Sequence, residues 1–279
     1  MQSLASFFTS DTLILSAIQS VAEFLPISST AHLRLVRAFL SPSSLDPTSP
    51  QVILQDLAMH LGTVLAVMVY FKNYFFQFFK LSLKPSWSQT LRLQLAVATL
   101  PIIFAALFIR QDILVSSIQH NTLLMACNFI GFGVLLYFSD LIGPETKQLE
   151  SMTYKDAFFI GCAQCLSIFP GVSRSGITMT MGRFCGLQRK DATRFSLMLA
   201  VPTVLAATGW AFVQLSYQKH TYPWHLVDTQ FYVSVALTFI GGLMSIHILV
   251  SWIKEHSFAA FMLYRIGLGL VLLKTLGVI

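Results

Sequence analysis

The chain has 279 residues, of which 55% are hydrophobic and only 11% are Asp, Glu, Lys or Arg, and its net charge is +6. Soluble domains usually carry roughly 25% charged residues. The composition, with a mean hydropathy of +0.69, therefore excludes an ordinary soluble protein and predicts an integral membrane protein. No nucleic-acid partner is expected. The cysteines lie in or beside apolar stretches and give no disulfide framework, and the lone Cys162-x-x-Cys165 pair does not predict a metal site.

The first informative segment is Gln19–His32, which reads Q-S-V-A-E-F-L-P-I-S-S-T-A-H. Pro26 lacks a backbone donor and should break a helix at that point. Gln19 and Glu23 are four residues apart and share one helical face before the break. After it, the run Ser28–Thr30 is a natural N-cap, and a helix start of this kind attracts an anion. The segment therefore gathers a carboxylate, hydroxyls and an imidazole in a pattern that favours phosphoryl chemistry.

A capped turn with a structural histidine is the alternative interpretation of this segment. It would be the common one in a soluble protein. Polar groups at bilayer depth are costly and tend to be functional, so the membrane context favours the functional interpretation.

Apolar stretches with few or no charges predict about six transmembrane helices. Two further apolar segments, at 13–22 and 157–173, are too short or end at a proline. The six predicted spans lie near 57–71, 93–109, 113–139, 195–218, 229–253 and 258–278.

The positions of Lys and Arg predict the orientation of these spans. Basic residues concentrate in the connections at 72–92, 147–155 and 183–194, which places these connections in the cytoplasm and both termini outside. The segment ending at Pro26 must then enter from outside and return, and the one ending at Pro170 must enter from the cytoplasm and return.

These two re-entrant hairpins predict an inverted repeat within one all-α membrane domain, 1–279, with halves at roughly 1–139 and 140–279. Gln19 precedes Pro26 by seven residues and Gln164 precedes Pro170 by six, so aligning the prolines requires a gap. Broken backbone at this depth is tolerable only where it lines a cavity or is covered by protein.

The second tip, residues 170–178, reads P-G-V-S-R-S-G-I-T. Its glycines allow close backbone approach, and its serines offer hydroxyls. Arg174 is a permanent cation whose planar fork suits phosphate oxygens. An arginine at the tip of an apolar hairpin needs an anion, which is either a ligand such as a lipid phosphate or, as the structural alternative, Glu23.

Together the two motifs resemble those of the undecaprenyl-diphosphatases, which recycle the bacterial cell-wall lipid carrier. The first, [E/Q]-x-x-x-E followed by F-L-P-I-S-S-T-A-H, covers 19–32, and the second, P-G-V-S-R-S-G, covers 170–176. The stretches 60–67 and 195–202, the length and the span layout agree, so the resemblance covers nearly the whole chain. Two positions depart from the family pattern: Gln19 removes one metal carboxylate, and Ala31 stands where Gly is common.

The resemblance implies that the chain removes the terminal phosphate of undecaprenyl diphosphate with a divalent cation, Mg²⁺ or Ca²⁺, and confers bacitracin resistance. It implies a multi-pass protein of the bacterial plasma membrane, with a homodimer as one option for its assembly. Family carry-over places five residues at the site. They are Glu23, Ser29, His32, Ser173 and Arg174.

Chemical requirements assign roles to these residues. Glu23 and Gln19 offer oxygens to a hard cation, and Arg174 with the two helix starts neutralises the diphosphate. Ser29 is the favoured nucleophile with His32 as its general base, because the i,i+3 spacing brings them together. A phosphohistidine at His32 stays open. The remaining predicted substrate-binding residues are Ser28, Thr30, Ser173, Ser175, Gly176 and Thr178.

Two functions of other classes compete with hydrolysis. A polyprenyl-phosphate transporter or flippase would suit an inverted repeat and would use the same arginine. A structural membrane protein would leave two polar re-entrant tips unexplained. The combination of Glu23, Ser29 and His32 favours catalysis, because a carrier has no need of an activated nucleophile.

Overall fold

The computed structural model describes residues 10–40, 49–78, 87–108, 121–219 and 227–279, without the side chains of residues 78, 88 and 214–219. These residues form helices and no strand, which confirms the predicted all-α class. Most of the predicted loop at 41–50, and the start of the predicted span at 113–139, lie outside the described residues. The helices are α1 Ser10–Ala22, α2 Ser29–Leu40, α3 Pro50–Tyr70, α4 Lys72–Phe78, α5 Trp87–Phe108, α7 Thr122–Ile142, α8 Tyr154–Gln164, α9 Arg174–Phe184, α10 Arg189–Lys219, α11 Thr229–Trp252 and α12 Ala259–Thr275.

Five of the described helices, α3, α5, α7, α10 and α11, are long and apolar enough to cross a membrane. The sixth predicted span corresponds to α12, which has 17 residues and is shorter than the other five. Several spans begin at a residue whose side chain accepts a bond from the first helical turn. Ser49 accepts from Val52 N at the start of α3, and Asp228 accepts from Phe231 N at the start of α11.

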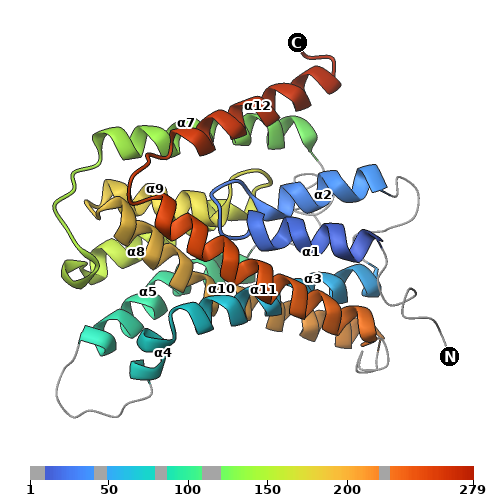
Figure 1. Cartoon of the computed structure of the whole chain (residues 1–279), viewed down its shortest axis with the longest axis horizontal. Coiled ribbons are helices and arrows are strands. Elements are labelled where there is room, and N and C mark those ends of the chain that lie inside the picture. The colour runs from blue at the N-terminus through green and yellow to red at the C-terminus, as the bar shows by residue number, and fades with distance from the viewer. Residues whose placement is uncertain (1–9, 41–48, 79–86, 109–120, 220–226) are drawn as a thin grey trace.

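Two short helical pairs, α1–α2 and α8–α9, lie among the long helices. Figure 1 shows α1–α2 entering the bundle from one end and α8–α9 from the other. In each pair the chain turns back before crossing the bundle, at Pro26–Ser28 in the first and at Pro170–Ser173 in the second. The structure therefore has the two hairpins that the sequence predicted.

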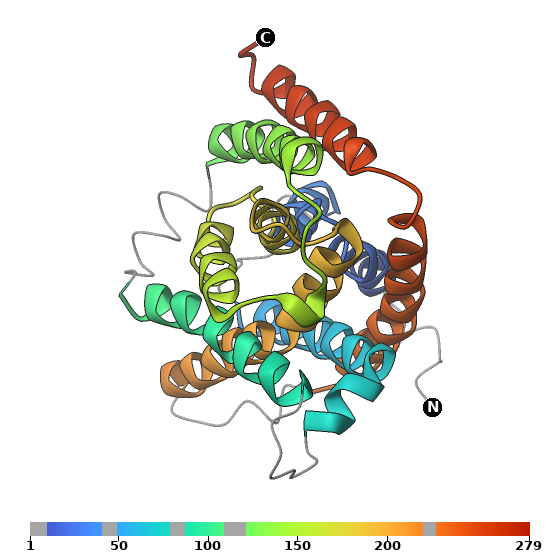
Figure 2. The same cartoon turned by 90° about the vertical axis from the view of Figure 1, so that its left-hand side faces the viewer.

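The helix contacts repeat when the two halves of the chain are exchanged. Helix α1 packs on α11 as α8 packs on α5, and α3 contacts α11 as α10 contacts α5. Helices α3 and α10 contact each other, and so do α7 and α12. Figure 2, viewed end-on, shows α7 and α12 side by side, with α3, α5 and α10 on the opposite side of the molecule. This exchange pattern is the one that an inverted repeat produces.

Candidate active site

The two hairpin tips share one unusual backbone angle. Ser28 and Ser173 immediately precede α2 and α9, and both have a left-handed φ, 75° and 74°. When these serines are aligned, Gln19 falls on Gln164 without a gap. The gap that the sequence comparison required was therefore wrong, because it equated the two prolines, whereas Pro26 is equivalent to Gly171. Gly171 itself has φ 85° and lies against the α7 backbone, so it has little room for a side chain.

Glu23 lies at the contact between the two hairpins. Its Oε1 accepts from Arg174 Nη2 at 2.9 Å, and its Oε2 accepts from Ser29 Oγ at 2.7 Å and Gln19 Nε2 at 3.1 Å. The carboxylate is only 6% exposed. The ion pair between Glu23 and Arg174, kept open as the structural alternative, is thus present. Both partners of this ion pair are predicted site residues, so the pair belongs to the site itself.

The expected hydrogen bond between Ser29 and His32 is replaced by other contacts. The Ser29 hydroxyl donates to Glu23, and the imidazole of His32 contacts Ser28 O through Nδ1 at 2.7 Å and Tyr264 Oη through Nε2 at 2.6 Å. Since Ser29 is the first residue of α2, its side chain points back to the preceding turn. The group that accepts the hydrogen bond of the predicted nucleophile is therefore Glu23 and not His32.

The hydroxyls of the second tip make contacts within the protein. Ser173 Oγ accepts from Gly176 N and caps α9, and it also contacts Ser175 Oγ at 3.2 Å. Ser175 Oγ donates to Leu25 O of the first hairpin at 3.0 Å, and Thr178 Oγ1 contacts Ser196 Oγ at 2.7 Å. These bonds join the hairpins to each other and to α10.

The substrate-binding roles predicted for the two tips stay predictions. Ser28 is buried, whereas Thr30 is exposed. Gly176 leaves room for a neighbouring guanidinium, because a Cβ there would lie 3.1 Å from Arg265 Nη1.

Arg265 and Tyr264 of α12 were not predicted as site residues. Arg265 is fully buried, and it donates to Pro26 O of the first tip and to Gly171 O and Val172 O of the second. Its remaining hydrogen bonds go to two α7 carbonyls, those of Phe129 and Asn128. The available signal was an arginine inside an otherwise apolar span, which by default marks a functional position.

His60 on α3 is a third residue that the motifs did not identify as part of the site. Its Nδ1 lies 3.2 Å from Gln19 Nε2 and 3.9 Å from Glu23 Oε2. The available signal was the stretch 60–67, which matched the family but carried no assigned role.

The predicted metal ligands offer two oxygens, one from Gln19 in α1 and one from Glu23 immediately after its end. Gln19 Oε1 is buried and has no hydrogen-bond partner, and Glu23 Oε2 lies one turn away. The described residues contain no group of three or more His, Cys, Asp or Glu that could hold a metal. The donor set thus fits a hard cation that takes most of its other ligands from phosphate and water.

Comparison with known proteins gives consistent matches. A family model described as bacitracin resistance protein BacA matches residues 12–271. An undecaprenyl-diphosphatase of Alteromonas mediterranea is 34% identical over 269 residues, covering 94% of this chain and 97% of that protein. The undecaprenyl-diphosphatase of Hahella chejuensis is 36% identical over 269 residues, covering 94% and 96%. That of Desulforudis audaxviator is 34% identical over 263 residues, covering 94% and 95%.

Proposed function

This chain belongs to the family of bacitracin resistance protein BacA, and from that membership we infer that it hydrolyses undecaprenyl diphosphate to undecaprenyl phosphate and inorganic phosphate. The same activity recycles the cell-wall lipid carrier and accounts for bacitracin resistance. The helices that can span a membrane suit a lipid substrate. We further propose the bacterial plasma membrane as its location and a homodimer as its assembly.

The observation that supports the mechanism most directly is the bond from Ser29 Oγ to Glu23 Oε2, 2.7 Å long and buried. A carboxylate that accepts from a hydroxyl can take its proton as the hydroxyl attacks. We propose that Ser29 Oγ attacks the terminal phosphorus and that its proton moves to Glu23. The bond from phosphorus to the bridging oxygen breaks, and undecaprenyl phosphate leaves. Glu23 then gives this proton to the departing phosphate, and in the second step it takes a proton from the water that attacks the phosphoserine. The bond from phosphorus to Ser29 Oγ breaks, inorganic phosphate is released, and Glu23 returns the proton to Ser29 Oγ.

Arg174 has two roles in this scheme. Without substrate it neutralises Glu23, and its Nη1 donates to Ser196 O at 3.3 Å. With substrate, its planar fork can bind phosphoryl oxygens and stabilise the charge that spreads over them in the transition state. The contact with Glu23 keeps the Arg174 guanidinium close to the Ser29 hydroxyl.

A divalent cation is proposed as cofactor, held by Glu23 and Gln19. When bound, it would supply additional positive charge to the diphosphate oxygens. The chain's own residues perform the proton transfer and the attack. Gln19 Nε2 orients the Glu23 carboxylate toward Ser29 through the bond at 3.1 Å.

His32 is less favoured as nucleophile than Ser29. Both of its ring nitrogens contact protein groups, Ser28 O and Tyr264 Oη. An attack through Nε2 would first require the contact with Tyr264 to break. Ser29 needs no such rearrangement, because its oxygen is already paired with the base.

Transport of a polyprenyl phosphate is the second candidate function, and one observation favours it. The two hairpins enter from opposite ends of the molecule, as in many carriers built from inverted repeats (Figure 1). Hydrolysis is tested with purified protein in detergent and a C55 diphosphate, with phosphate release as the readout. Release by the wild type and its loss in Ser29→Ala supports hydrolysis. No release by an intact, folded protein would leave transport as the better assignment.

A further inference from the structure

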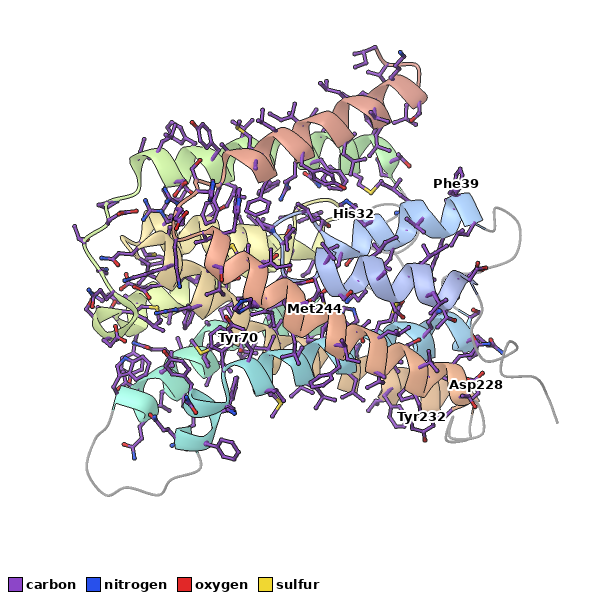
Figure 3. All side chains as sticks on the ribbon, in the orientation of Figure 1. His32, Phe39, Tyr70, Asp228, Tyr232 and Met244 are labelled. Atoms are coloured by element: carbon purple, nitrogen blue, oxygen red, sulfur yellow. The ribbon has the colours of Figure 1, made fainter. Side chains whose placement is uncertain are left out.

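Two consecutive residues of α12, Tyr264 and Arg265, contact residues of the first hairpin that lie 232 and 239 positions away in the sequence. Tyr264 Oη lies 2.6 Å from His32 Nε2, and the two rings are stacked, with centroids 5.6 Å apart and planes at 14°. His32 also meets the edge of the Phe129 ring, with centroids 5.8 Å apart. Figure 3 shows His32 at the inner end of α2, next to the α7–α12 pair. The imidazole is thus held between α7 and α12.

The contacts of His32 determine which nitrogen carries its proton. Ser28 O is a carbonyl oxygen and can only accept, so Nδ1 must carry the hydrogen in the 2.7 Å bond. In the neutral imidazole Nε2 then has a lone pair, and the Tyr264 hydroxyl is the donor to it. The donor at Tyr264 therefore suits the Nδ1–H tautomer of His32, which the bond to Ser28 O requires.

Arg265 fixes the position of Tyr264 relative to the tips. Its guanidinium donates to Pro26 O at 3.0 Å, to Gly171 O at 2.8 Å and to Val172 O at 3.0 Å. These bonds attach α12 to the backbone of both hairpins at the residue next to Tyr264. The position of the Tyr264 hydroxyl is therefore fixed relative to the two hairpin tips, whose residues include Ser29 and Arg174.

The Ser28 carbonyl connects His32 to the proposed nucleophile. It accepts from the backbone N–H of His32 at 3.2 Å as well as from the imidazole. Ser28 has the left-handed φ of 75°, and Ser29 is the next residue. Any change in the orientation of the imidazole therefore alters a bond to the strained residue that directs the Ser29 hydroxyl toward Glu23.

We propose that Tyr264 is a positioning residue that holds His32 in the Nδ1–H tautomer and thereby keeps the Ser28–Ser29 tip in its reactive conformation. The expected effect on kcat rests on the proposed function, whereas the tautomer of His32 does not depend on it. Without the tyrosine hydroxyl, Nε2 loses its donor, and the Nε2–H tautomer, which cannot donate to Ser28 O, becomes accessible.

The tautomer is measured by ¹⁵N NMR of histidine-labelled protein in detergent, with His32 assigned by comparison with His32→Gln. The wild type is expected to show Nδ1 protonated and Nε2 unprotonated at neutral pH. Tyr264→Phe, which keeps the stacked ring, should show a mixture of the two tautomers. Tyr232→Phe is the matched control, because Tyr232 is exposed on α11 and should leave the His32 signals unchanged.

Kinetics with the C55 diphosphate completes the test. Tyr264→Phe should lower kcat about five- to tenfold, the effect of one lost neutral hydrogen bond, with KM within twofold of wild type. A wild type in the Nε2–H tautomer, or a Tyr264→Phe variant with unchanged tautomer or unchanged kcat, would overturn the inference. Failure of the wild type to release phosphate would instead contradict the proposed function and leave the tautomer result standing.

Discussion

Ser28 and Ser173 have nearly the same positive φ, 75° and 74°, and among the described residues they are the only non-glycine residues with positive φ. Each immediately precedes a re-entrant helix, α2 or α9. Such backbone costs on the order of 1–3 kcal/mol and persists only where the surroundings enforce it. Here the enforcing contacts are the bonds from His32 to Ser28 O and the cap from Ser173 Oγ to Gly176 N. Strain in the two tips is thus concentrated at the residues next to Ser29 and Arg174.

The first prediction concerns this strain. Ser28→Gly should keep or raise the apparent melting temperature in detergent, because glycine adopts positive φ without steric cost. Ser28→Val should destabilise the protein by about 1–3 kcal/mol, because a β-branched side chain is poorly tolerated there. Thermal unfolding followed by circular dichroism compares the two. Equal melting temperatures for the valine and glycine variants would show that the tip is free to relax.

The second prediction concerns the pair Glu23–Arg174. Arg174→Ala leaves a buried carboxylate without its cation and should cost about 3–5 kcal/mol of stability as well as all turnover. Adding Glu23→Gln should recover most of the stability and none of the activity, because the charge is then removed from both partners. Lys155→Ala, at an exposed lysine of α8, is the control. A stable Arg174→Ala single variant would mean that the ion pair contributes little to folding.

A conservative change at the same arginine separates charge from geometry. Arg174→Lys keeps a cation beside Glu23, so its stability should lie near that of wild type. Its kcat should still be low, because a point charge cannot reproduce a planar fork on phosphate oxygens. Steady-state kinetics and melting temperatures are measured on one preparation of the Arg174→Lys variant. A kcat near that of wild type would contradict the need for the planar fork.

The fourth prediction separates the nucleophile from the groups proposed to bind the cation. Ser29→Ala should lose at least about 10²-fold in kcat at every Mg²⁺ or Ca²⁺ concentration, because no cation replaces an attacking oxygen. Glu23→Gln also loses the base and should recover only partly at high metal concentration. Phosphate release is measured across a metal titration. If Ser29→Ala kept substantial activity while His32→Ala had none, the nucleophile would be His32.

The fifth prediction concerns Arg265. Arg265→Lys should destabilise the protein by more than about 3 kcal/mol, because an ammonium cannot reach all five carbonyls, and each of the tip carbonyls of Pro26, Gly171 and Val172 that is left unpaired costs about 1–3 kcal/mol. Lys274→Gln is the matched control, because Lys274 is exposed at the other end of α12. Melting temperatures in detergent provide the comparison, and equal values for the two variants would contradict the role of Arg265 in joining the tips.

The residue pattern by itself determined the fold class and part of the site. Hydropathy revealed the long spans, because every backbone group in a bilayer must be bonded within its own helix. Pro26 and Pro170 marked the breaks, and the costly polar residues at the breaks indicated Glu23, Ser29 and Arg174 as candidate site residues. In the structure the Glu23 carboxylate accepts hydrogen bonds from Ser29 at 2.7 Å and from Arg174 at 2.9 Å, so the three side chains are in contact.

Only the tertiary structure decided how the site groups are paired. Helical spacing says which residues share a face but not where a side chain at the first turn points, so Ser29 was matched with His32 and not with Glu23. Aligning the two halves by their prolines displaces the repeat by one residue, because the equivalent feature in both tips is the positive φ of Ser28 and Ser173. Tyr264 and Arg265 contact groups 232 and 239 positions away in sequence. No local periodicity records contacts of that range, because they arise only when α12 packs on α7 and covers both hairpin tips.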